Sequence, residues 1–263
     1  MKRIYQALAE IEEKSQVAAL ATIVRSHGST PRHGTSKMLV YANGKTLGTV
    51  GGGELERRVH AGALESMQDG EARYLTYQMN DPAQGDAGVC GGTVEVFVEP
   101  ILPKATLLLI GAGHVGKAVA HLAKWLDYRV VIVEDKPEFC TPEHIPGGDE
   151  YLAIEMEEIA EKVHINAQTF VVMATRGADV DSLALPDLLK SQAAYIGVIG
   201  SKKRWLEAIK LTRARGVDKK ELKRVHSPIG LEIEAETPEE IAISIMAEIL
   251  MIRHGGTGEK MSK

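Results

Sequence analysis

One short segment constrains the fold of this 263-residue chain more than any other. The run GAGHVG at residues 111–116 directly follows an apolar stretch, residues 107–110, and opens a segment with apolar residues at helical spacing. Glycines at this spacing let the chain turn tightly and bring bare backbone close to a pyrophosphate, while the start of the helix attracts negative charge. The segment therefore predicts a Rossmann-type turn in which Gly111, Gly113, His114 and Gly116 bind a phosphorylated ligand.

Two acidic residues follow at the spacing that this turn requires. Residues 129–133 resemble a second strand, which ends in Glu134 and Asp135 about twenty residues after the glycine-rich run, where a ribose-binding carboxylate belongs. An acidic end to this strand favours NAD or another nucleotide with an unphosphorylated ribose over NADP. The alternative is a turn that serves only to pack the helix on the strand and binds no ligand. This alternative remains, because Rossmann-like sheets host many unrelated functions.

Alternating segments extend this pattern to the C-terminal half. Strand-like and helix-like stretches alternate, with strands expected at 106–110, 129–133, 169–174 and 194–199, and helices at 114–126, 181–190, 202–215 and 239–253. Such alternation predicts a parallel sheet. Thr237, Pro238 and Glu240 have the spacing of a capping box at the start of the last helix. We expect a Rossmann-like domain over residues 104–254, followed by a flexible tail at 255–263.

The first hundred residues differ in pattern. Helical segments at 3–14 and 54–68 are interspersed with strand-like runs, and two pairs of runs predict hairpins, at 38–50 and at 74–98. In the first, Asn43-Gly44 predicts a type I′ turn. Pro100 and Pro103 mark a linker. The predicted fold class is α/β, with a small α+β domain over residues 1–100 followed by the Rossmann-like parallel-sheet domain.

Composition excludes several classes of function. The net charge of −5 offers no basic surface for nucleic acid, and the longest apolar runs are far shorter than the roughly 20 residues of a membrane span. The N-terminus lacks the apolar run of a signal peptide. Two cysteines cannot form a disulfide framework and lack zinc-site spacing. We therefore expect a cytoplasmic protein that binds neither nucleic acid nor membrane, and the sequence assigns no metal site.

Other glycine-rich segments are candidate sites for anions. Gly51, Gly52 and Gly53 precede a helical segment, so their amides either bind an oxyanion or form a bend required by crowding against the sheet. Gly200 and Ser201 follow a strand and precede three cations, which either bind a ligand or form a solvated helix face. The loop 175–181 follows another strand at the ligand-binding edge, where its last aspartate could instead cap the next helix.

A cysteine between glycines is the third candidate. Cys90 is followed by Gly91 and Gly92, which leave its thiol approachable if the loop faces a cleft. A thiolate there could ligate a soft metal or carry sulfur. The alternative is a small buried hydrophobic residue, the more common role of a lone cysteine.

Several of these segments resemble, in order, the XdhC/CoxI family of xanthine dehydrogenase accessory proteins. The similar segments are GSTPR at 28–32, GTVGGG at 48–53, CGGTVEV at 90–96, GAGHVG at 111–116, AYIGVIGSK at 194–202, SPIGL at 227–231 and AETPEEIA at 235–242. The resemblance runs from about residue 18 to 253. Ala178 departs from it where the family often has histidine, and Glu232 and Glu234 stand where aspartate and glycine are usual. Any metal or acid/base role of that histidine is absent here.

The resemblance implies a protein that binds molybdenum cofactor, supports its sulfuration with a cysteine desulfurase, and hands it to a xanthine dehydrogenase-type molybdenum hydroxylase. Such a protein is a chaperone more than a catalyst, and the resemblance also implies a homodimer. Molybdopterin carries a phosphate that suits a glycine-rich helix start and a metal that suits the thiolate of Cys90. We expect the glycine and cysteine loops to face the Rossmann turn across a cleft. The residues alone leave open an NAD-dependent oxidoreductase or a scaffold with an empty site.

Overall fold

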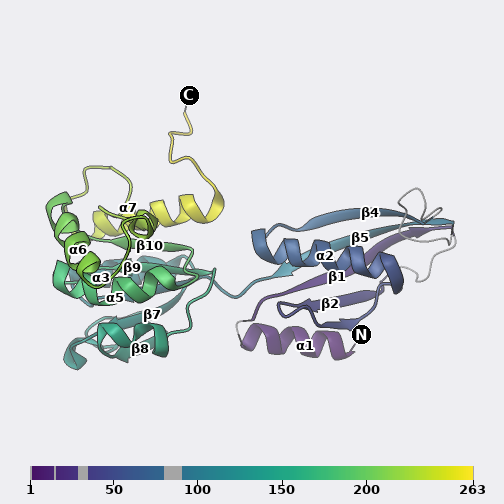
Figure 1. Ribbon diagram of the computed structural model, residues 1–263, viewed down its shortest axis with the longest axis horizontal. Coiled ribbons are helices and arrows are strands. Elements are labelled where there is room, and N and C mark those ends of the chain that lie inside the picture. Colours follow the sequence, from purple (N-terminus) through teal and green to yellow (C-terminus); the bar gives the residue numbers. More distant parts are fainter. Residues whose placement is uncertain (1, 15, 29–34, 80–90, 263) are drawn as a thin grey trace. The chain divides into compact units, whose positions relative to one another are not determined.

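The computed structural model describes residues 2–14, 16–28, 35–79 and 91–262. Contacts divide the chain into two compact units, Met1–Pro103 and Lys104–Lys263 (Figure 1). The first contains an antiparallel sheet packed with helices, and the second contains a parallel sheet with helices on both faces. This arrangement confirms the predicted fold class. Within the described residues, no helix is both long and apolar enough to cross a bilayer.

The N-terminal unit is a five-stranded antiparallel sheet in the order β3-β2-β1-β5-β4. Its elements are α1 Lys2–Glu13, β1 Ala18–His27, β2 Lys37–Tyr41, β3 Thr46–Gly48, α2 Gly53–Asp69, β4 Arg73–Met79 and β5 Gly92–Ile101. Successive side chains of a strand point to opposite faces. Ala19 and Ala21 accordingly pack in the core under α2, whereas Ala18 and Leu20 pack with the apolar side of α1. The central strand β1 is thus covered on both faces.

The hairpin between β2 and β3 forms, but with a different turn from the one predicted. Gly44 has a φ of +78°, whereas Asn43 does not adopt a positive φ, so the type I′ prediction is wrong. The Gly44 amide donates to the Tyr41 carbonyl at 2.8 Å, and the Asn43 side chain accepts from the Lys45 amide at 3.0 Å. An asparagine side chain that accepts from the backbone two residues further on forms an Asx turn, which stabilises the loop without a positive φ at the asparagine itself. A single left-handed glycine then completes the loop.

The C-terminal unit is a six-stranded parallel sheet in the order β11-β10-β9-β6-β7-β8. Its strands and helices are β6 Thr106–Ile110, α3 His114–Trp125, β7 Arg129–Glu134, β8 Glu150–Ala153, α4 Ile159–Lys162, β9 Thr169–Met173, α5 Ala178–Lys190, β10 Tyr195–Val198, α6 Lys202–Ala214, β11 Val225–His226 and α7 Pro238–His254, with 3₁₀ helices η2 Pro137–Phe139, η3 Met156–Glu158 and η4 Glu221–Arg224. The sequence pattern did not predict β8, α4 or β11. Each has four residues or fewer, too short for a periodic pattern.

Helices cover the parallel sheet on both sides. Leu107 and Leu109 of β6 face the core shared with α3 and α7, and Leu108 and Ile110 face the core shared with α5. After β6 the chain crosses one face of the sheet through α3, and after β9 it crosses the other face through α5. The strand order therefore reverses between these two neighbouring strands. In an open parallel sheet this reversal leaves a crevice at the carboxyl ends of the strands, where ligands bind.

Candidate functional site

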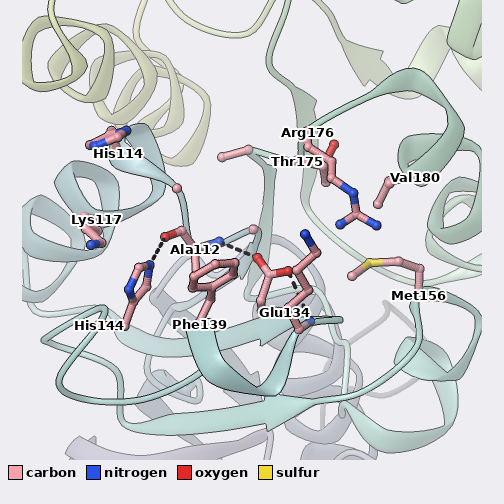
Figure 2. A pocket seen from close by; sticks show the side chains of 14 residues that line it. Ala112, His114, Lys117, Glu134, Phe139, His144, Met156, Thr175, Arg176 and Val180 are labelled. Carbon is pink, nitrogen blue, oxygen red and sulfur yellow. Dashed lines mark hydrogen bonds between the residues drawn. The ribbon is translucent and has the colours of Figure 1, made fainter.

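A cavity of about 420 Å³ lies at the carboxyl edge of the parallel sheet, where the strand order reverses (Figure 2). The segments that follow β6, β7 and β9 form its walls, together with η3 and the start of α5. The residues lining it are Gly111, Ala112, Gly113, His114, Lys117, Glu134, Lys136, Phe139, His144, Met156, Ala174, Thr175, Arg176 and Val180. The fold thus brings four predicted site residues, Gly111, Gly113, His114 and Glu134, to one cavity.

The three glycines of the turn have different tasks. Gly111 has a φ of +107°, and a Cβ there would lie 2.5 Å from the Ala174 carbonyl oxygen. A Cβ on Gly116 would lie 2.3 Å from the Gly111 oxygen, so both positions require glycine for packing. A Cβ on Gly113 would meet no described atom within 4 Å. Gly111 and Gly116 therefore shape the turn, and Gly113 leaves the backbone open to a ligand.

Helix α3 begins at this cavity without a side-chain cap. Among the described residues none caps its N-terminus, where Gly113 is the N-cap. By contrast, Ser201 accepts a hydrogen bond from the first turn of α6, and Thr237 forms a capping box with Glu240 in α7. Uncapped amides and the helix dipole attract an anion, and Lys117 lines the same cavity one turn further along. The start of α3 is the part of the cavity best suited to a phosphate.

Glu134 supplies a fixed carboxylate at the end of β7. Its Oε2 accepts a hydrogen bond from the Ala112 amide at 2.9 Å, and its Oε1 accepts one from the Lys136 amide at 3.3 Å. The residue is 8% exposed. Burial, reinforced by neighbouring Asp135, raises the pKa of the Glu134 carboxyl although the two amides oppose this. Each oxygen can accept further hydrogen bonds, so the side chain can bind hydroxyl groups in the cavity.

Among the described residues, Glu134 lines this cavity but Asp135 does not. Both of its oxygens accept hydrogen bonds from the Arg176 guanidinium, at 2.7 and 2.5 Å. This pair connects the end of β7 to the loop after β9. Arg176 lowers the pKa of the Asp135 carboxyl to about 2.

Replacing Arg176 with glutamine should return the pKa of Asp135 from about 2 toward its ordinary value of 3.8. In the wild type the pair stabilises the fold above that ordinary value, and this contribution disappears as the pH falls toward 2. Carboxyl carbon NMR across an acid titration measures the change directly. Lys190→Gln, which removes an exposed partner of Asp187, is the control. An Asp135 titration unchanged in the Arg176 variant would contradict this assignment.

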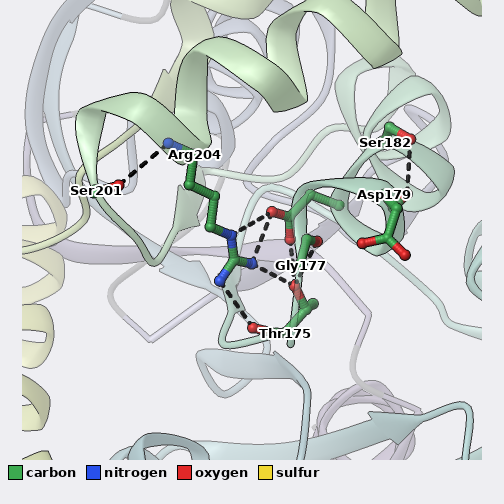
Figure 3. Close-up of polar contacts among 7 residues, drawn as sticks. Thr175, Gly177, Asp179, Ser182, Ser201 and Arg204 are labelled. Carbon is green, nitrogen blue, oxygen red and sulfur yellow. Dashed lines mark hydrogen bonds and ion pairs between the residues drawn. The ribbon is translucent and has the colours of Figure 1, made fainter.

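A second polar cluster supports the loop after β9 (Figure 3). Arg204 of α6 donates to the Asp181 carboxylate at 2.8 Å and to the Thr175 hydroxyl at 2.7 Å, and its guanidinium also binds the Thr175 carbonyl at 3.1 Å. The Thr175 hydroxyl in turn donates to Asp181, which is fully buried. The expectation that Asp181 caps α5 is wrong, because it lies within the helix and Gly177 is the N-cap.

The glycine segment before α6 lies outside the cavity. Of the residues described, neither Gly200 nor Ser201 is among those that line it. The Ser201 hydroxyl accepts from the Arg204 amide at 3.2 Å, and a Cβ on Gly200 would lie 2.7 Å from the Arg204 side chain. Ser201 therefore caps the start of α6, and Gly200 leaves room for the Arg204 side chain. The arginine of the expected cation group is therefore an internal ion-pair partner, whereas Lys202 and Lys203 are exposed.

The triple glycine before α2 also has internal partners. The Gly51 amide donates to the Thr49 hydroxyl at 3.1 Å, and the Gly52 amide donates to the Glu56 carboxylate at 3.1 Å. These two amides are occupied without any anion. Crowding does not explain the glycines either, since a Cβ on Gly52 or Gly53 would meet no described atom within 4 Å. All three residues have positive φ, which accounts for glycine at each position.

Cys90, the predicted thiolate, lies outside the described residues. Its neighbours Gly91 and Gly92 are described and lie at the start of β5, against the end of β1. A Cβ on Gly28 would lie 2.9 Å from the Gly91 oxygen and 3.1 Å from the Gly92 Cα. The first residue of the GSTPR segment is therefore in backbone contact with the two glycines that follow Cys90.

Several lining residues had no signal in the sequence. Phe139, His144 and Met156 come from the irregular segment between β7 and α4, which has no apolar period. His144 Nε2 lies 3.1 Å from the Ala112 oxygen, and its ring lies 4.9 Å from that of Phe139. Lys117 could have been identified, because it lies one turn after the glycine-rich run on the predicted helix.

Comparisons with known proteins agree with this geometry. A model described as the XdhC Rossmann domain matches residues 107–249, and a model described as the XdhC and CoxI family matches residues 12–78. The chain is 36% identical over 262 residues to "Uncharacterized protein YqeB" of Escherichia coli (strain K12), covering 99% of this chain and 48% of that protein. It is 31% identical over 161 residues to a probable xanthine dehydrogenase subunit of Bacillus subtilis (strain 168), covering 61% of this chain and 47% of that protein.

A solved structure shares the fold. The crystal structure of a xanthine dehydrogenase from Bacillus halodurans matches with a TM-score of 0.52 at 23% identity, covering 98% of this chain and 97% of that one. The chain spans about half the length of the two curated relatives it matches. The resemblance predicted from the motifs is confirmed by the family matches, which together extend over both units. The chain belongs to the XdhC and CoxI family.

Proposed function

We propose that this chain is a maturation factor for a xanthine dehydrogenase-type molybdenum hydroxylase and that it binds molybdenum cofactor without turning it over. Membership of the XdhC and CoxI family and the similarity to a probable xanthine dehydrogenase subunit support the role in maturation. The observation that carries the cofactor proposal is the start of α3. There an open glycine backbone, an uncapped helix N-terminus and Lys117 face one cavity of about 420 Å³.

The residues of the cavity fit the phosphate of molybdopterin. Amides at the start of α3 would hold its oxygens, Lys117 would contribute positive charge, and the His114 ring would offer a further hydrogen-bonding group. Once in the hydroxylase, the cofactor supplies the molybdenum centre at which the substrate reacts. The task of this chain is to hold the phosphate end and shelter the rest of the molecule in the cavity, then release it. A carrier needs no general base or nucleophile beside the turn.

The proposal also covers the sulfuration of the cofactor. We infer from the family that a cysteine desulfurase supplies the sulfur, that Cys90 is the thiolate that meets the cofactor or carries sulfur, and that the protein acts as a homodimer. The resemblance, and not any measured contact, is the basis for these partners.

Replacing Gly113 with valine should weaken the binding of isolated molybdopterin cofactor at least tenfold while leaving the fold intact. The new side chain would enter open space in front of the helix start, so it blocks the approach of a phosphate without a clash in the protein. Ultrafiltration followed by pterin and molybdenum analysis measures the bound fraction, and thermal unfolding checks the fold.

Gly256→Val is the matched control for this experiment. A Cβ there meets only ordinary contacts with Met251, at 3.6 Å, beyond the end of α7. This variant should bind cofactor like the wild type. Absence of stoichiometric binding to the wild type would refute the carrier proposal. Equal binding by the Gly113 variant would exclude the start of α3 as the phosphate site.

A further inference from the structure

We propose that two copies of this chain associate through the outer edge of β4, by antiparallel pairing of β4 with the β4 of the second copy. This inference rests on the proposed function, because it gives an interface to the homodimer inferred there. Three observations carry it. β4 is a long edge strand without a described partner on its outer side, it lacks the features that prevent edge pairing, and its sequence matches itself across a two-fold axis.

β4 is the longest edge strand in the described part of the chain. The N-terminal sheet ends in β3 and β4, and the C-terminal sheet ends in β8 and β11 (Figure 1). Three of these four strands are short, with three residues in β3, four in β8 and two in β11. β4 has seven residues, and among the described strands it pairs with β5 alone. Its outer backbone groups are therefore available to another strand.

β4 also lacks the usual protection of an exposed edge. Natural proteins protect such edges with charged residues, proline or a bulge, or keep them short. Residues 74–79 contain neither a charged residue nor a proline, and the register with β5 runs without a shift from Arg73 to Met79. By contrast, β1 has a register shift against β5 between Ile23 and Arg25. A long, regular and uncharged edge of this kind is expected to have a partner strand.

Pairing at this edge would also cover apolar side chains on both faces of β4. Leu75 and Tyr77 pack in the core under α2 and are half-buried. Tyr74 lies on the opposite face, where it is 60% exposed, and it is opposite Phe97 of β5, which is 36% exposed. A strand beside β4 would cover the open sides of Leu75 and Tyr77 and extend the surface around Tyr74.

The sequence of β4 suits pairing with a copy of itself. Two antiparallel neighbouring strands of identical chains are related by a two-fold axis perpendicular to the sheet, so equivalent side chains lie on the same face. Pairing over all seven residues places Thr76 opposite the second copy's Thr76, and Tyr74 opposite Gln78. No charge then lies opposite a like charge, which would oppose pairing. Arg73, at the end of the strand, is already paired with Asp69 of its own copy.

This pairing produces a closed assembly. The two N-terminal sheets would form one continuous sheet, whose outer edges are the three-residue strand β3 of each copy. An edge that short offers little to a further strand, so association stops at two copies. A different protein would need a long, uncharged edge of its own to fit β4. The second copy supplies such an edge, and for this reason we assign it as the partner.

Sedimentation equilibrium of the full chain over a range of concentrations measures this association. The wild type should have twice the monomer mass of 28.5 kDa. Thr76→Lys and Thr76→Glu each place like charges opposite one another at the two-fold axis, so the dissociation constant of each variant alone should rise at least tenfold. An equimolar mixture of the two variants should associate again, because lysine then lies opposite glutamate. A merely structural effect of the substitutions would not produce this recovery.

Thr46→Lys is the matched control, because Thr46 is exposed on β3 at the opposite edge of the same sheet. This variant should associate like the wild type. Amide hydrogen exchange gives a readout of position that needs no variant. In the wild type, exchange over residues 73–79 should slow as the protein concentration rises, whereas exchange over residues 46–48 should not change.

Several outcomes would overturn the β4 interface. They are a monomeric wild type, unchanged association of either Thr76 variant, and a mixture of the two variants that stays monomeric. Slow exchange of residues 73–79 at every dilution would also overturn it, because another part of the same chain would then cover the edge.

The result separates this inference from the proposed function. A dimer that survives both Thr76 substitutions would exclude β4 as the interface and leave the homodimer in place. A monomeric wild type would remove the homodimer as well. In either case the carrier proposal is decided separately, by the binding of molybdopterin cofactor to the wild type and to the Gly113 variant.

Discussion

Replacing Arg204 with methionine is expected to lower the free energy of unfolding of the C-terminal unit by about 3–5 kcal/mol, the usual cost of removing one partner from a buried ion pair. Asp181 is fully buried and receives hydrogen bonds from Arg204 and Thr175. Burial already raises the pKa of its carboxyl, although these two partners oppose the shift. Without the guanidinium, the carboxylate must either stay charged in an apolar setting or take up a proton.

Urea unfolding followed by tryptophan fluorescence measures this loss. The chain has two tryptophans, Trp125 and Trp205, and both lie in the C-terminal unit, so their emission reports on that unit alone. This matters because unfolding of a two-unit protein need not be a single transition. Because the variant raises the pKa of Asp181 further, its deficit should be largest at neutral pH and shrink in acid, where the carboxyl is protonated in both states.

Two comparisons make the Arg204 prediction specific. Lys202→Met removes an exposed cation from the same helix and should change stability by no more than about 0.5 kcal/mol. Adding Asp181→Asn to Arg204→Met should recover part of the loss, since the buried charge is then gone. An Arg204 variant as stable as the wild type at neutral pH would show that Asp181 is not buried as described.

Gly116→Val should destabilise the same unit by about 3 kcal/mol or more, in the range of strongly overpacked core positions, and should reduce the yield of folded protein. A Cβ at this position would lie 2.3 Å from the Gly111 carbonyl oxygen, which belongs to the backbone and cannot move aside as a side chain could. Helix α3 would have to separate from the end of β6, and the cavity would lose its phosphate-binding edge.

The informative comparison is with Gly113→Val, the same substitution three residues earlier. Both glycines belong to one turn, but a side chain at Gly113 enters open space. We expect the Gly113 variant to unfold at the same urea concentration as the wild type but to bind the ligand weakly. The Gly116 variant should be less stable than the wild type even without ligand. The same unfolding curves measure both. Equal stability of the two variants would mean that helix and strand do not pack closely at Gly116.

The parts of this fold that the sequence predicts are those encoded in a few consecutive residues. In the turn at 111–116, the positive φ of Gly111 and the contact of Gly116 with the Gly111 oxygen are both local, and the capping box of Thr237 and Glu240 is complete within one turn of helix. The same reasoning failed at Asn43-Gly44. There the asparagine side chain accepts a hydrogen bond from the Lys45 amide, and of the two residues Gly44 alone adopts a positive φ.

Much of the site could not be predicted because it depends on the strand order. Arg176 and Asp135 are 41 residues apart, and Arg204 and Asp181 are 23 apart, so their pairing follows from the order of the strands in the sheet. The sequence predicted that both Glu134 and Asp135 contact the ligand. In the described structure Glu134 lines the cavity, whereas Asp135 pairs with Arg176. The segment that supplies His144 has no periodic pattern from which its position could be derived.

The backbone contact between Gly28 and Gly91 limits how this protein can evolve. A side chain at residue 28 would press on the main chain of residues 91 and 92, so it could be accepted only if the end of β1 and the start of β5 moved apart together. No exchange at Gly91 can relieve this contact, because the atoms opposite residue 28 belong to the main chain, and a Cβ on Gly91 would itself meet no described atom within 4 Å. Glycine at residue 28 is therefore imposed by the backbone opposite it, and not by any side chain that could change with it.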